Sequence, residues 1–106
     1  MEYIICYAED ETDSSRFRWK KANGSSPEDA VRSYCMNNFR IWDCDNCGTD
    51  YYQFAVENGE GTVFFSVAHS WWWADWETEN RYVDNEFNIE SIEKSFLSKR
   101  RDWLVV

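Results

Sequence analysis

The sequence predicts one α+β domain over residues 1–106, with an antiparallel sheet of about four to five strands and two helices in the order β-β-α-β-β-β-α. Residues 51–76 carry the strongest evidence, because two runs of alternating apolar and polar residues flank a turn, as in a β-hairpin. Signals that start helices occur at residues 26–29 and again near residue 88. We expect both helices to pack mainly on one face of the sheet.

The predicted central hairpin has one apolar face. Its members alternate along both arms and are Tyr52, Phe54, Val56, Val63, Phe65 and Val67. Two loops preserve this face, a two-residue loop at 58–59 and a four-residue loop over 58–61. The shorter loop would place Glu57 directly opposite Glu60, and like charges in that position destabilise a sheet. We therefore predict the four-residue loop, with Val56 facing Val63.

The first two strands are predicted at residues 2–8 and 16–21. Residues 2–8 are apolar on both sides of the alternation, as expected of a strand that is covered on both faces. The charged segment 9–15 is predicted to be a loop. Residues 16–21 alternate cations with Phe17 and Trp19, which is typical of a half-exposed strand.

The first helix is predicted to begin after Ser26. The Ser26 side chain can cap the first free amides, and Pro27 suits the first helical position. Glu28 and Asp29 interact favourably with the positive end of the helix dipole. The side chains predicted to face the sheet are Ala30, Val31, Tyr34, Cys35 and Phe39.

The C-terminal part is predicted to contain a short last strand within 77–84 and a second helix over 89–100. Asn88 can cap this helix, acidic residues come early in it and basic residues late. Ile89, Ile92 and Phe96 form its apolar stripe. The tail 102–106 is apolar, and we expect it to dock as an edge strand.

The composition predicts a folded, acidic protein with a partner. A hydrophobic content of 43% excludes a disordered chain, and an aromatic content of 19% is more than one small core can hide. The net charge of −9 is uneven, since residues 43–93 hold twelve acidic residues against the single cation Arg81. Such a surface repels nucleic acid and attracts basic proteins, although it can also serve solubility alone.

The chain carries no recognisable targeting segment. The N-terminus lacks the positive region of a secretory signal, and no stretch approaches the ~20 apolar residues of a membrane span. We expect a cytoplasmic protein whose cysteines are thiols or metal ligands rather than disulfides.

One motif could bind metal. Cys44 and Cys47 form a C-x-x-C pair, the spacing with which two thiolates hold one zinc ion. A structural zinc site needs four ligands, and the remaining candidates are Cys6, Cys35 and His69. A small zinc-stapled interaction module within a larger assembly is therefore the alternative function. No enzyme is predicted, because no nucleophile lies at a recognisable spacing from His69 and no glycine-rich phosphate loop occurs.

The tryptophan run at 71–76 supplies the candidate binding site. The alternation that buries Val67 assigns Trp71 and Trp73 to the covered face and leaves Trp72 and Trp76 on the opposite face. Acidic residues nearby can form a charged rim around this aromatic centre. The predicted partner-binding residues are Trp72, Asp75, Trp76, Glu77, Glu79, Asp84 and Glu86.

These features predict a small non-enzymatic protein that inhibits or regulates a basic partner, such as a nucleic-acid-processing protein, by occupying it. In size, acidity and lack of motifs the chain resembles the small acidic proteins with which phages block host nucleic-acid-binding machinery, such as anti-CRISPR proteins and other DNA mimics. This resemblance is one of composition, and it implies a viral inhibitor. No direct contact with nucleic acid or membrane is expected.

Overall fold

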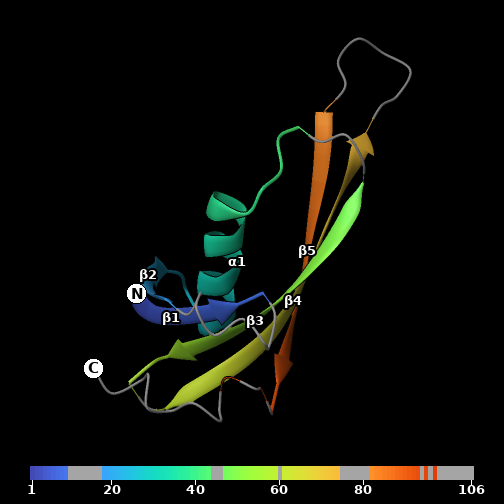
Figure 1. The fold of residues 1–106 in the computed structure, drawn as a ribbon. Coiled ribbons are helices and arrows are strands. Elements are labelled where there is room, and N and C mark those ends of the chain that lie inside the picture. Colours follow the sequence, from blue (N-terminus) through green and yellow to red (C-terminus); the bar gives the residue numbers. More distant parts are fainter. Residues whose placement is uncertain are drawn as a thin grey trace.

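A computed structural model describes residues 1–9, 18–43, 47–59, 61–74, 82–93, 95 and 97. In this part of the chain, one five-stranded antiparallel sheet in the order β2-β1-β3-β4-β5 is covered on one face by one helix, α1 (Figure 1). The predicted α+β class and antiparallel sheet are confirmed. No helix in these residues is long and apolar enough to cross a membrane.

The five strands differ in length. They are β1 Glu2–Ala8, β2 Arg18–Asn23, β3 Gly48–Glu57, β4 Thr62–Ala74 and β5 Tyr82–Ile92. The three long strands, β3 to β5, run past the end of α1 (Figure 1). One end of the sheet therefore lies outside the cover that the helix provides.

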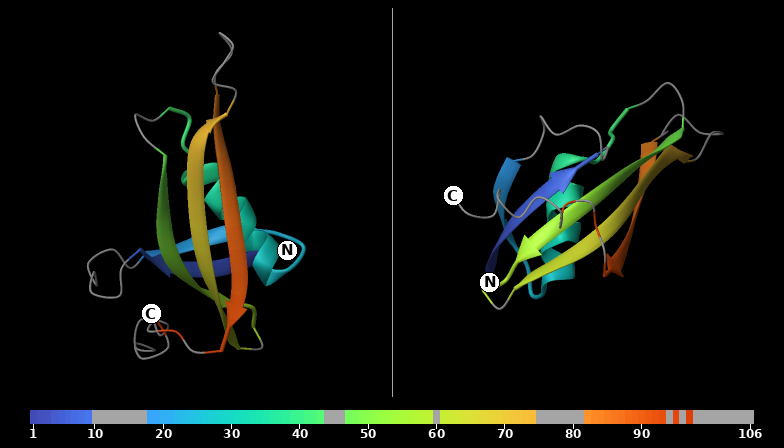
Figure 2. Two further views of the ribbon diagram at one scale, coloured as in Figure 1. Left: turned by 90° about the vertical axis from the view of Figure 1, so that its right-hand side faces the viewer. Right: turned by 60° about the horizontal axis from the view of Figure 1, so that its bottom comes forward.

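Helix α1 spans Pro27–Asn38 and lies against one face of the sheet (Figure 2). It begins as the sequence predicts, because the Ser26 side chain accepts a hydrogen bond of 3.1 Å from the backbone N–H of Asp29. The helix buries Ala30, Val31 and Cys35 against the sheet. The first predicted helix and its inward stripe are thus confirmed.

The main core lies between α1 and the sheet. Every second side chain of each strand points to this face, which is why the core collects one parity from each strand. The buried strand residues are Tyr3, Ile5, Ala22, Phe54, Val56, Phe65, Val67, Phe87 and Ile89. Beside them, the rings of Phe39 and Tyr52 stack with 4.5 Å between their centroids.

The β3–β4 hairpin has the predicted register. Val56 pairs with Val63 and Glu57 with Thr62, across the four-residue loop 58–61. The backbone N–H of Asn58 donates to the Gly61 carbonyl at 3.2 Å, and Gly59 adopts a φ of 84°, which glycine tolerates without steric cost.

The predicted second helix is wrong where the structure describes it. β5 runs to Ile92, so Asn88 and Ile89 lie in a strand paired with Ala68 and Val67 of β4. The row of β5 that faces the core is interrupted by Asn85, a polar residue, and this hides the strand alternation in the sequence. The predicted edge strand at 102–106 lies outside the described residues.

Three strand boundaries also differ from the predictions. β2 continues to Asn23 rather than ending at residue 21, and β3 begins at Gly48, inside the stretch 40–50 that the sequence predicts to be a loop. The short last strand predicted within 77–84 is the longer β5. The early start of β3 follows from pairing, since Gly48 lies opposite Trp71 and leaves space for it: a Cβ on Gly48 would lie 2.6 Å from Trp71 Cζ2.

Candidate functional site

The sheet face opposite α1 carries three large aromatic side chains that solvent reaches. Tyr51 on β3 is 67% exposed, Trp72 on β4 is 37% exposed and Tyr82 on β5 is 54% exposed. Exposed aromatic rings gathered on one surface of a protein are typical of a contact site. Together with the acidic residues that share this face on β5, they form what we call the aromatic–acidic face: Tyr51, Trp72, Tyr82, Asp84, Glu86 and Glu90.

The strand register places the acidic groups beside the aromatic ones. Trp72 lies directly opposite Asp84 in the β4–β5 ladder, and the next residues along the same face pair Ser70 with Glu86. Directly opposite residues have Cβ atoms about 4.5–5.5 Å apart, so Asp84 borders the indole of Trp72. The geometry is an exposed ring next to a row of carboxylates.

No positive side chain offsets these carboxylates within the three strands. The sequences of β3, β4 and β5 contain neither lysine nor arginine. The side chains between the aromatic groups are small, since β4 presents Ser66, Ala68 and Ser70 here, and Ser70 Oγ lies 3.1 Å from Thr49 Oγ1. The face therefore has a negative field that attracts cationic groups.

The part of this sheet face nearer β1 is covered. Cys6, Ala8 and Ala55 pack there with Leu97, and Trp19 and Phe64 border the cluster. Ser95 Oγ donates a hydrogen bond to Gln53 Oε1 from the same C-terminal segment. The two parts of one face thus differ: the β1 side forms a second small core, and the β4–β5 side keeps its aromatic residues exposed.

Three of the seven predicted partner-binding residues lie in the described chain, and the structure brings these three together. They are Trp72, Asp84 and Glu86. The other four, Asp75, Trp76, Glu77 and Glu79, lie outside the described residues.

The sequence prediction omitted Tyr51, Tyr82 and Glu90. Tyr51 could have been found, because assigning Tyr52 to the covered face places its neighbour on the other face. Tyr82 and Glu90 could not, because the local sequence pattern there favours a short strand followed by a helix.

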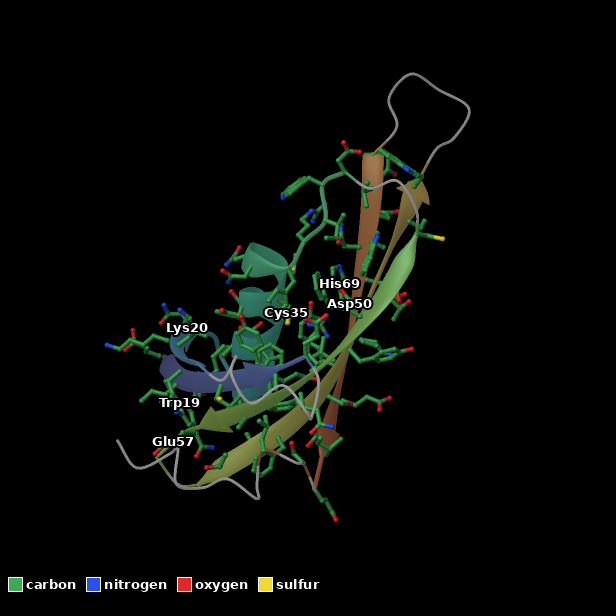
Figure 3. All side chains as sticks on the ribbon, in the orientation of Figure 1. Trp19, Lys20, Cys35, Asp50, Glu57 and His69 are labelled. Carbon is green, nitrogen blue, oxygen red and sulfur yellow. The ribbon has the colours of Figure 1, made fainter. Side chains whose placement is uncertain are left out.

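The only histidine in the sequence, His69, is buried and has a structural role. His69 is 1% exposed, stacks on Phe87 at 4.3 Å between ring centroids, and lies on the α1 side of β4. Its cross-strand neighbour is Asp50, as Figure 3 shows. Its Nε2 atom lies 2.8 Å from Asn85 Oδ1.

Asn85 fixes the proton on that nitrogen. Asn85 Oδ1 also accepts from the backbone N–H of Ile41 at 2.8 Å, and Asn85 Nδ2 donates to the Ile41 carbonyl at 2.9 Å. Since Oδ1 is an acceptor in this pairing, His69 Nε2 must be the donor. The three residues join β4, β5 and the segment after α1.

The cysteines do not form a metal site in the described chain. Cys6 lies in the small core of one sheet face, Cys35 lies in the main core of the other face, and Cys47 is exposed. Cys44 is outside the described residues, and no group of three His, Cys, Asp or Glu side chains in the remainder could hold a metal ion. Cys6 and Cys35 could not both join Cys47 around one zinc, because the sheet separates them.

Burial shifts the pKa of several core groups upward. Desolvation raises the pKa of the Cys35 thiol to about 12, although the charge of Arg32 opposes the shift. Desolvation also raises the pKa of Tyr34, with help from its hydrogen bond to Tyr7. The pKa of Tyr52 is raised first by burial and then by the Asp50 and Glu9 carboxylates.

Comparison with known proteins adds no relative. No protein-family model matches the chain, no curated protein matches it, and no solved structure matches it.

The first prediction concerns Asn85. We expect Asn85→Ala to lower the free energy of unfolding by about 2–4 kcal/mol, because the buried His69 donor and the Ile41 backbone lose their partners. Asn88→Ala is the matched control, since Asn88 is exposed three residues along the same strand, and we expect it to change stability by less than ~0.5 kcal/mol. Urea unfolding of both variants measures this. Equal losses would contradict a structural role for Asn85.

The second prediction concerns alkaline pH. An unfolded chain releases the Cys35 proton near the ordinary thiol value of about 8.5, whereas the folded chain holds it to a pKa of about 12. The folded state therefore binds more protons between these values, and stability falls as pH rises through them. We expect the unfolding free energy of Cys35→Ala to fall less steeply than that of the wild type between about pH 9 and pH 11. Parallel pH profiles in denaturant titrations would contradict this.

Proposed function

We propose that this protein is a non-enzymatic binding protein that inhibits or regulates a basic protein by occupying it through the aromatic–acidic face. The supporting observation is the exposed Trp72 in direct register with Asp84, on a face whose strands carry no cation. An aromatic ring supplies the desolvated anchor of an interface, and surrounding charges supply orientation and encounter rate.

The charge of this face indicates the class of partner. Proteins that process nucleic acids carry lysine and arginine along the surface that neutralises phosphates. Carboxylates in a row present the same sign of charge to such a surface, so the proposed partner is a nucleic-acid-processing protein and the proposed mode of action is occupancy of its basic groove. The expected role of a viral protein that mimics DNA is part of this proposal.

The position of His69 supports the proposal that the protein acts without catalysis. Its Nε2 proton is committed to Asn85, and its ring is stacked on Phe87 in the core. A general base must reach a substrate proton within hydrogen-bond distance, and a side chain that is 1% exposed has no such access.

The third prediction separates binding from folding. Trp72→Ala should weaken capture of the partner by about 2–4 kcal/mol, as expected for an aromatic anchor at an interface centre. Trp42→Ala is the control, because Trp42 is 75% exposed but follows α1 rather than lying on this face. Capture from lysate, identification of the captured protein and thermal melting of each variant provide the measurement. The proposal fails when Trp72→Ala captures the same basic protein as strongly as the wild type, or when no basic protein is captured.

The fourth prediction concerns charge. Glu86→Lys should slow association with the captured partner and reduce the dependence of the association rate on salt. Glu28→Lys makes the same change in net charge at an exposed position of α1 and should have the smaller effect. Stopped-flow measurements at low and high salt compare the two. Equal rates for both variants would show that net charge, rather than this face, controls association.

A further inference from the structure

The outer edge of β5 carries main-chain groups whose direction can be derived from the hairpin. The Asn58 N–H donates to the Gly61 carbonyl, so these two residues form a hydrogen-bonded pair. Hydrogen-bonded and non-hydrogen-bonded pairs alternate along an antiparallel ladder. Every second pair from there onward is hydrogen-bonded, which includes the pair of Asp50 with His69. The odd-numbered residues of β4 therefore direct their main-chain groups to β3.

The even-numbered residues of β4 must then direct their main-chain groups to β5. Their partners are the even-numbered residues of β5, for example Glu86 opposite Ser70. The odd-numbered residues of β5 consequently direct their N–H and C=O groups away from the sheet. They are Val83, Asn85, Phe87, Ile89 and Ser91.

One side-chain contact supports this assignment independently. Arg32 Nη1, from α1, donates to the main-chain carbonyl of Phe87 at 3.1 Å. Phe87 is an odd-numbered residue, and its carbonyl is reached by a side chain rather than by a strand. β5 is the last strand in the sheet order, so no strand in the described chain pairs with this edge.

We propose that β5 takes up an extended, basic segment of the partner as a sixth strand of the sheet. This inference rests on the proposed function and adds to it the mode of recognition. Main-chain groups of an edge strand provide affinity for an extended peptide, and the side chains on one face provide selectivity. Here that selectivity would come from Asp84, Glu86 and Glu90.

The spacing of the carboxylates favours an extended segment. Side chains on one face of a strand repeat every two residues, about 6.8 Å apart. Asp84 and Glu86 are separated by this interval, and Glu90 by twice this interval from Glu86. Lysine or arginine at alternate positions of an incoming strand repeats at the same interval, so cations opposite Asp84, Glu86 and Glu90 each meet a carboxylate, and one position between them faces Asn88. Trp72, one strand further in, borders the same row.

A second copy of this chain is a poor occupant of the edge. Antiparallel pairing of two β5 strands about Phe87 would set Asp84 of each copy opposite Glu90 of the other. Like charges directly opposite destabilise a sheet. Charge complementarity therefore selects a basic segment over self-association.

Amide hydrogen exchange with a defined probe tests the inference. The probe is a ten-residue peptide that alternates lysine with threonine, and its control alternates glutamate with threonine. In the free protein, the odd-numbered amides of β5 should exchange faster than the even-numbered amides, which are bound to β4. On addition of the lysine peptide, exchange at Asn85, Phe87 and Ile89 should slow by about tenfold or more. The glutamate peptide should change nothing.

A backbone substitution gives a second measurement on the same edge. Ser91→Pro removes one outward N–H and no ladder hydrogen bond, and proline is tolerated at such edge positions. We expect it to weaken binding of the lysine peptide severalfold, while Ser91→Ala, which keeps the N–H, binds as the wild type does.

Three results would overturn the edge assignment. Peptide binding that perturbs Trp72 but leaves the odd-numbered amides unprotected would place the segment on the sheet face. Failure of the peptide to bind, with partner capture still sensitive to Trp72→Ala, would leave the proposed function intact and remove the added strand. Protection of the odd-numbered amides at high protein concentration without peptide would assign the edge to a second copy. A separate result would contradict the proposed function itself, namely that the Trp72→Ala variant captures the partner as strongly as the wild type does.

Discussion

The register of the β3–β4 hairpin is the constraint on which the rest of the structure depends. Val56 opposite Val63 sends one parity of each long strand toward α1 and the other parity away from it. A shift of one residue in a strand would exchange the two faces of that strand. The face on which Trp72 lies and the outward direction of the β5 main chain follow from this register together with the β4–β5 pairing, which sets Trp72 opposite Asp84.

The helix is shorter than the strands that it covers, and this explains where the aromatic and polar residues lie. At 12 residues α1 is about 18 Å long, whereas the 13 residues of β4 extend over about 43 Å. Towards the end of the strands that runs past the helix, His69 and Trp71 lie on the α1 side of β4, with 5.1 Å between their ring centroids. Asn85 holds the chain after α1 against this end through both backbone groups of Ile41. A partly buried polar network thus joins β4 and β5 to the segment after α1.

The sequence was sufficient for features that depend on local chemistry. The helix start at Ser26, the hairpin loop and the assignment of Trp72 to the face opposite the core each follow from a short pattern, and the structure has all three. It was insufficient for β5. Ile89 and Ile92 fit the spacing of a helical stripe, and Asn88 fits a helix cap, so the local pattern was ambiguous. The polar Asn85 in the buried row removed the alternation that would have resolved it, because its partner His69 lies 16 residues away in the sequence.

In β5, the odd-numbered side chains contribute to the stability of the fold, and the even-numbered side chains are available for recognition of a partner. Its odd-numbered side chains, such as Val83, Phe87 and Ile89, are buried, while Asp84, Glu86 and Glu90 stand on the other face. Charges on the outer face of an edge strand cost little folding energy, and they discourage pairing with further copies of the same edge. The same charges favour a basic strand in that place. An acidic edge strand can therefore protect the protein from self-association and select its partner with one set of residues, provided that the partner presents an extended basic segment.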